Sequence, residues 1–171
     1  MKVVSDTTTL IAFLGLGKLS ILKELFGKLS IPKAVHDELH QKTIPPLKEW
    51  VEVIEIKDRR SYGSYRKILG RGESEALCLC QQIGADAILL DDRRARLVAS
   101  HLSLKAMGTL GVLLLAKRKG LIVTVRPEIE RLEQEVRFRI APWLREKAKS
   151  CPVASERALA IGFIAQNRCS V

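Results

Sequence analysis

The sequence contains few cysteines, and none are paired as zinc sites require. The four stand at Cys78, Cys80, Cys151 and Cys169, and no two of them are separated by two residues. Cys78 and Cys80 lie in an apolar helical run with no histidine beside them, so we expect buried thiols rather than a nucleophile. The pattern excludes a disulfide-rich secreted domain and favours a reducing compartment.

Long apolar runs are also absent. The strongest candidate, residues 110–116, stops at Lys117, well short of the ~20 residues that a membrane-spanning helix needs. The amino-terminal stretch enters a strand-like pattern at once and has no apolar core of the kind found in signal peptides. We therefore expect a cytoplasmic protein that does not associate with membranes.

Acidic residues are outnumbered by basic ones, at 19 Asp and Glu against 29 Lys and Arg, which gives a formal charge of +10. This balance favours a polyanionic partner such as RNA or DNA, although it also suits solubility or an acidic protein partner. With 171 residues and 47% hydrophobic content, the chain is long enough for one domain with a substantial core. We expect that domain over residues 1–149 and a poorly ordered tail over 150–171, where the periodic pattern fades.

Strand-like and helix-like patterns alternate along the chain. We expect strands over residues 3–5, 29–31, 50–56, 87–90 and 104–106, with helices between them and further helices over 126–135 and 140–149. This alternation predicts an α/β fold around a parallel sheet with right-handed crossovers. The basic stretch 57–70 predicts a surface loop, or a clamp in which Tyr62 and Tyr65 stack on unpaired bases.

Carboxylates follow two of these strands. Asp6 comes after the first, and Asp91 and Asp92 come after the strand over 87–90. In a parallel sheet those strand ends share one edge, where ligands collect and where like charges repel each other unless a cation is present. Mg²⁺ or Mn²⁺ would suit such oxygen ligands and the hydrolysis of a phosphodiester. Asp6 has an alternative role, because it also suits the N-cap of the helix that follows.

Three further acids lie on predicted helices. Glu38 belongs to the helix after Pro32, where a solvated position is its ordinary alternative. Glu73 and Glu75 lie in the first turn of the helix that begins near Gly72, which is a common stabilising position for acids. They point ~200° apart around that helix, so at most one of the two can face a shared site.

Five short segments, taken in order, resemble the PIN-domain nucleases and most closely their small prokaryotic VapC-toxin-like branch. They are residues 4–7 (VSDT), 31–39 (IPKAVHDEL), 72–76 (GESEA), 90–93 (LDDR) and 108–113 (GTLGVL). The resemblance implies a PIN-like three-layer α/β/α sandwich with a central parallel sheet. It also implies a Mg²⁺- or Mn²⁺-dependent endoribonuclease, the toxin of a toxin–antitoxin pair, which forms a homodimer and is inhibited by a small antitoxin. The alternatives are a nucleic-acid or protein binding module without catalysis, and a structure-specific DNA nuclease.

Carried over by position, the resemblance assigns catalytic roles to Asp6, Glu38, Glu73 and Asp92. It assigns metal binding to Asp6, Glu73, Asp91 and Asp92, with Glu75 as an alternative to Glu73. Asp91 could replace Asp92 in its role or hold the end of the strand. Glu38 would orient water at the metal. The supporting hydroxyls would be Thr7 and Thr109. The sequence departs from the family pattern at Thr8 and Thr9, where relatives often have Ser and Pro.

Basic residues follow the second acidic cluster at once. Arg93, Arg94 and Arg96 open a helix beside the proposed metal, where they would bind substrate phosphates or simply form a solvated helix face. His36, His40 and His101 are expected to be surface or packing residues, because an oxygen-only metal site needs no imidazole.

Overall fold

The computed structural model describes residues 1–42 and 49–140. Most of the helix expected over 140–149 and the whole tail expected over 150–171 lie outside these residues. Within the described ranges, no helix is both long enough and apolar enough to cross a membrane.

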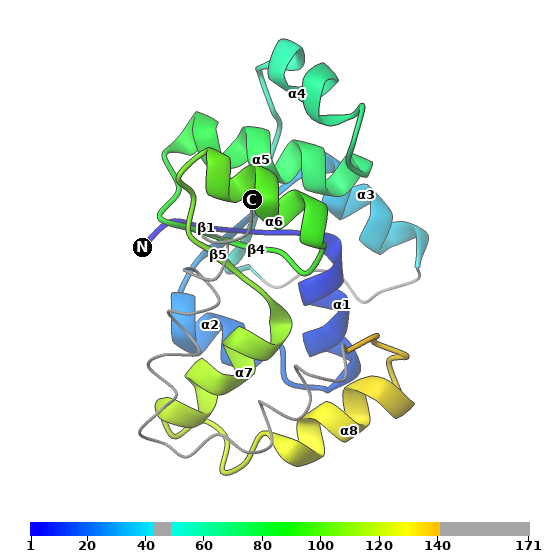
Figure 1. Cartoon of the computed structure of the whole chain (residues 1–171). Coiled ribbons are helices and arrows are strands. Elements are labelled where there is room, and N and C mark those ends of the chain that lie inside the picture. The colour runs from blue at the N-terminus through cyan, green and yellow to red at the C-terminus, as the bar shows by residue number, and fades with distance from the viewer. Residues whose placement is uncertain (43–48, 141–171) are drawn as a thin grey trace.

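A parallel sheet of five strands forms the centre of the fold, as the sequence predicted (Figure 1). The strands are β1 (Val3–Ser5), β2 (Leu29–Pro32), β3 (Val51–Ile54), β4 (Ala87–Leu89) and β5 (Ala106–Met107), in the order β3-β2-β1-β4-β5. The central strand β1 pairs with β2 on one side and with β4 on the other. The acids that follow β1 and β4 therefore lie at neighbouring strand ends. The last strand starts two residues later than expected.

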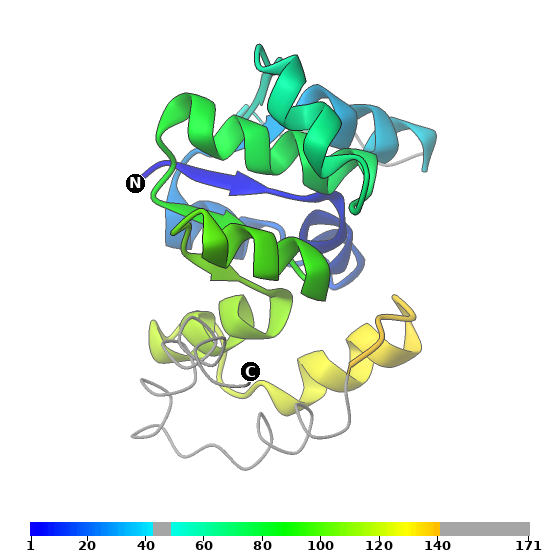
Figure 2. The same ribbon diagram turned by 45° about the horizontal axis from the view of Figure 1, so that its top comes forward.

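Helices cover both faces of the sheet, which makes the three-layer α/β/α architecture (Figure 2). The side chains of β1 alternate, so Val3 packs into one core with α1 (Thr7–Gly15), α2 (Ser20–Phe26), α7 (Thr109–Arg118) and α8 (Arg126–Gln134). Val4 packs into the other core with α5 (Arg71–Ile83) and α6 (Arg93–His101). The helix α3 (Lys33–Gln41) contacts both α1 and α5.

The prediction of a loop over residues 57–70 is wrong in part, because this stretch contains the helix α4 (Arg59–Tyr65). Asp58 caps this helix by accepting hydrogen bonds from the backbone nitrogens of Arg60 and Ser61, both at 3.0 Å. The poor helix formers Tyr62 and Gly63 concealed the helix, whereas the N-cap aspartate was the available signal. Tyr65 donates to Gln81 Oε1 at 2.9 Å, which fastens its ring to α5 rather than leaving it free as a base platform.

The two cysteines of α5 are buried, as expected. Burial raises the pKa of Cys78 to about 11 and also raises the pKa of Cys80. Both therefore remain neutral thiols at neutral pH and are not nucleophiles.

Candidate functional site

Asp6 lies directly after β1 and is 2% exposed. Its Oδ1 accepts a hydrogen bond from the backbone nitrogen of Thr9 at 2.9 Å, so it does cap α1. Its Oδ2 is buried and has no hydrogen-bond partner among the residues that the structure describes. A buried carboxylate oxygen without a hydrogen-bond partner lowers the stability of the folded state. The capping role therefore explains the position of Oδ1 but not that of Oδ2.

Asp91 follows β4 and is held by two threonines. Its Oδ1 accepts from the Thr109 nitrogen at 2.9 Å, and its Oδ2 accepts from the hydroxyls of Thr109 at 2.6 Å and Thr9 at 3.3 Å. Thr9 thus bridges the two acids, since its backbone donates to Asp6 and its hydroxyl to Asp91. The sequence predicted a supporting hydroxyl at Thr109, but it did not predict the bridge through Thr9. The departure from the family pattern at position 9 was the available indication.

Burial raises the proton affinity of both aspartates, and the charge of Asp91 raises that of Asp6 further. The pKa of Asp6 is raised to about 8, first by burial, then by the charge of Asp91, with a smaller contribution from Glu73. Burial raises the pKa of Asp91 as well, against the hydrogen bonds from Thr109 and Thr9 and the positive charge of Arg96. Two carboxylates held together in this way favour either a proton or a cation between them.

Arg96 is the one member of the predicted arginine trio that is partly buried, and it lies beside Asp91. Burial lowers the pKa of its guanidinium, while the charge of Asp91 acts in the opposite direction. A Cβ at Gly108 would come within 2.8 Å of Asp91 Oδ1 and 3.6 Å of Arg96 Nη1, so the glycine leaves room for both groups. Arg93 and Arg94 are exposed at the start of α6.

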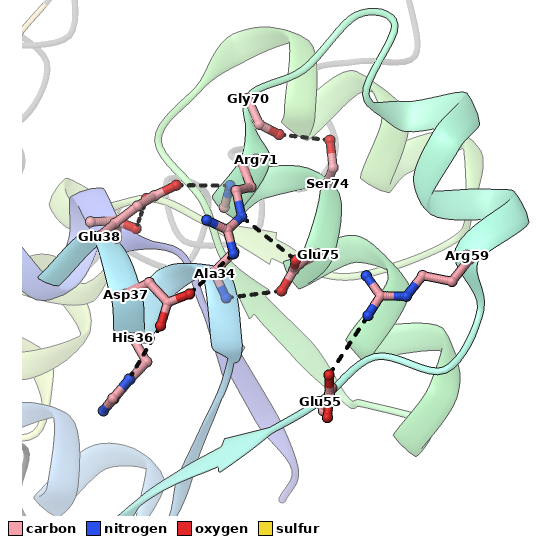
Figure 3. A network of polar contacts seen from close by, with 12 residues as sticks. Ala34, His36, Asp37, Glu38, Glu55, Arg59, Gly70, Arg71, Ser74 and Glu75 are labelled. Carbon is pink, nitrogen blue, oxygen red and sulfur yellow. Dashed lines mark hydrogen bonds and ion pairs between the residues drawn. The ribbon is translucent and has the colours of Figure 1, made fainter. Parts of the chain in front are cut away.

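Glu73 and Glu75 point in different directions, as the helix geometry predicted. Glu73 is half-buried, and its charge acts on Asp6. Glu75 is 5% exposed and its Oε2 accepts from the Ala34 nitrogen at 2.9 Å, in the first turn of α3 (Figure 3). Arg71 Nε lies 3.9 Å from the other oxygen of Glu75. Glu75 therefore joins α5 to α3 instead of facing Asp6.

Glu38 lies where three helices meet, and its carboxylate accepts two hydrogen bonds. One comes from the Thr7 hydroxyl at the start of α1, and the other comes from the Gly72 nitrogen at 3.1 Å (Figure 3). A Cβ at Gly72 would lie 2.8 Å from Glu38 Oε2, so a side chain there would displace the carboxylate. The predicted supporting hydroxyl Thr7 therefore contacts Glu38, whose carboxylate is fixed by the hydrogen bonds from Thr7 and Gly72.

Asp92 is exposed and caps α6, because its Oδ1 accepts from the Ala95 nitrogen at 2.8 Å. The resemblance gave Asp92 the catalytic role after β4 and left Asp91 as its alternative. In the structure the charge of Asp91 acts on Asp6, whereas Asp92 is turned toward the first turn of α6. The catalytic role of either residue stays a prediction.

The histidines occupy the surface. His36 and His40 are one turn apart on α3 with their Nε2 atoms at 3.0 Å, and His101 Nδ1 lies 2.8 Å from the Leu97 carbonyl oxygen. His36 Nδ1 lies 3.8 Å from Asp37 Oδ1, and Figure 3 shows the two side chains beside each other.

The donors at the carboxyl edge fit a hard divalent cation. They are oxygens, and Asp6 Oδ2 is a buried acceptor that lacks a partner in the described part of the chain. Over residues 1–42 and 49–140, no group of three His, Cys, Asp or Glu side chains is close enough to hold a metal ion by itself. Mg²⁺ commonly keeps several waters and binds through only one or two carboxylates, which the pair Asp6 and Asp91 provides.

Comparison with protein families identifies one family whose model matches most of the chain. A model of the PIN domain matches residues 2–151, which include every helix and strand described above and all of the acids discussed. No curated protein and no solved structure matches the chain.

Proposed function

The chain belongs to the PIN domain family, whose members are generally nucleases, and on that premise we propose that it is a Mg²⁺- or Mn²⁺-dependent endoribonuclease. The observation that carries the proposal is the buried Oδ2 of Asp6, which has no hydrogen-bond partner within residues 1–42 and 49–140 and lies beside a second carboxylate, Asp91. A bound divalent ion would polarise a phosphoryl oxygen and make water a better nucleophile.

Each acid then has a role that follows from its contacts. Asp6 and Asp91 bind the ion, and Glu73, whose charge reaches Asp6, is a third acid available on the same side. Thr9 and Thr109 fix Asp91 through their hydroxyls. Glu38, held by Thr7 and Gly72, orients the attacking water from a fixed position. Asp92 is assigned to capping α6 rather than to catalysis.

The basic residues guide the substrate. The formal charge of +10 raises the local concentration of a polyanion. Arg93 and Arg94 are exposed at the start of α6, close in the chain to Asp91, where they bind phosphates that flank the scissile bond.

We further propose that the chain is the toxin of a toxin–antitoxin pair in the VapC-like branch and that it forms a homodimer. The support is the order and spacing of the five motif segments. An antitoxin Arg or Lys placed among the acids would pair with Asp6 Oδ2, which has no partner in the described residues. Such pairing would inhibit the enzyme by taking the position of the cation.

The first experiment measures cleavage of a labelled single-stranded RNA with Mg²⁺, with Mn²⁺ and with EDTA, for the wild type and Asp6→Asn. We expect EDTA to abolish cleavage and either ion to restore it. The variant should lose more than about a hundredfold in kcat/KM, because even partners that only orient metal ligands are worth about 10–100-fold. Asp58→Asn is the matched control, since Asp58 is an exposed N-cap aspartate on α4 and should retain full activity.

The alternatives give different results in the same assay. Cleavage of DNA without cleavage of RNA would indicate the DNA nuclease, and RNA binding without cleavage would indicate a binding module. Cleavage that is indifferent both to EDTA and to Asp6→Asn would contradict the site itself.

A further inference from the structure

A cavity of about 320 Å³ has Asp91 among its lining residues. Thr8 of α1 and Lys42, the residue after α3, line part of it. The segment that follows α8 contributes Arg137, Phe138 and Arg139 to the lining. Its volume lies at the lower end of the range of about 300–1,000 Å³ that is usual for ligand pockets.

Three of the eight residues that line the cavity are basic and Asp91 is the one acid among them, while Ile11, Val136 and Phe138 are apolar. Lys42, Arg137 and Arg139 are all exposed. Over residues 1–42 and 49–140, none of these three side chains forms an ion pair. Three cations that share one small cavity repel each other, so an anion bound between them would be stabilised.

The segment that carries the two arginines is anchored by its other residues. Val136 packs so closely on Gly15 of α1 that a side chain at Gly15 would collide with it. Phe138 donates its backbone N–H to the Leu132 carbonyl at 2.9 Å, and Ile140 is buried. The apolar positions 136, 138 and 140 therefore hold the segment against the core, while the alternate positions 137 and 139 are exposed.

Arg137 has a φ of 55°, in the left-handed region that residues other than glycine seldom adopt. Such a conformation persists only where the surrounding structure maintains it, and it is enriched at ligand-binding sites. Here the anchors on either side, Val136 and Phe138, maintain it.

We propose that this cavity binds a short single-stranded segment of RNA next to the scissile bond, with its phosphates on Lys42, Arg137 and Arg139. The inference rests on the proposed function in naming RNA as the substrate. Phosphates on these cations would place the strand next to Asp91, which lines the same cavity and belongs to the proposed metal site. A single strand fits better than a duplex, because the cavity is small and Phe138 adds a half-buried aromatic ring to its wall.

The test is binding of a fluorescent single-stranded RNA, measured in EDTA so that cleavage does not contribute. Arg137→Gln with Arg139→Gln should weaken binding at least about tenfold and reduce the salt slope by about 1.4, since each phosphate contact contributes about 0.7 for single strands. Arg118→Gln with Arg126→Gln removes the same charge from two exposed positions, the last residue of α7 and the first residue of α8, and should change the affinity by less than about twofold. Thermal unfolding verifies that both double variants fold.

The failure of this inference differs from the failure of the proposed function. If both double variants weaken binding equally, if the cavity variant binds like the wild type, or if an acidic peptide binds and RNA does not, the inference is overturned whatever the enzyme does. If the cavity variant alone loses RNA binding while the wild type cleaves no RNA with either ion, the cavity is an RNA site and the nuclease proposal fails. In an active enzyme we expect the cavity variant to raise KM and leave kcat nearly unchanged, because these side chains lie outside the acidic cluster.

Discussion

Asp91 and Asp92 are adjacent after β4, and Glu73 and Glu75 are two residues apart on α5. The two members of each pair nevertheless make different contacts. In each pair one carboxylate acts electrostatically on Asp6, namely Asp91 and Glu73. The other member binds the start of a helix instead: Asp92 accepts from Ala95 of α6, and Glu75 accepts from Ala34 of α3. Binding a helix start does not by itself exclude an acid from the site, because Asp6 and Asp91 also accept backbone N–H groups, from Thr9 and Thr109. The difference shows that neighbouring acids are separated by the direction of their side chains, and the two that act on Asp6 are the candidate ligands beside it.

The sharpest test of this comparison is the pair of variants Asp91→Asn and Asp92→Asn. We expect Asp91→Asn to lose more than about a hundredfold in kcat/KM with Mg²⁺, because it removes a charge that binds the ion. Asp92→Asn should lose only a few-fold, since Asn caps a helix about as well as Asp. RNA cleavage assays measure both. The reverse result would return the catalytic role to Asp92.

The second pair separates activity from stability. Glu73→Ala should lower kcat/KM by about 10–100-fold with little effect on the melting temperature. Glu75→Ala should leave kcat/KM nearly intact but lower the free energy of unfolding by about 1–3 kcal/mol, because the buried Ala34 N–H loses its acceptor. That loss corresponds to about 2–4 °C per kcal/mol in a chain of this size. If Glu75→Ala abolished activity in a fully folded protein, the assignment of the two acids would be exchanged.

The last prediction concerns the pH dependence of the free energy of unfolding. The pKa of Asp6 is raised from 3.8 to about 8, so the native metal-free protein holds this proton while the unfolded chain releases it. The free energy of unfolding therefore falls as the pH rises from about 4 through 8. We expect the wild type in EDTA to lose several degrees of melting temperature between pH 5 and pH 8, and Asp6→Asn to lose less. Thermal unfolding at both pH values measures the difference, and equal losses would show that Asp6 is ionised without a cation.

Much of this architecture is readable from the sequence. The alternation of strands and helices predicts the parallel sheet, and the adjacency of β1 and β4 brings Asp6 and Asp91 to one edge. The 200° separation of Glu73 and Glu75 predicts that one faces away, but not which, because that depends on the position of the Ala34 N–H on another helix.

Other features depend on contacts between distant segments. The Thr9 hydroxyl reaches Asp91 from 82 positions away, and nothing local to Thr9 indicates that partner. The cavity combines Lys42 with Arg137 and Arg139, which follow the last described helix, and no local pattern indicates that these two arginines share a cavity with Lys42. The helix α4 was hidden by weak helix formers although its Asp58 cap was visible.

Five of the described helices, α1, α3, α5, α6 and α7, begin at the carboxyl edge of the sheet, immediately after Asp6, Pro32, Gly70, Asp92 and Gly108. Their peptide dipoles direct partial positive charge toward the same small volume, each worth about 0.3–1 kcal/mol to a nearby anion. This fixed field helps the fold to gather so many carboxylates before any ion arrives. It also attracts a phosphodiester to the acids that would otherwise repel it.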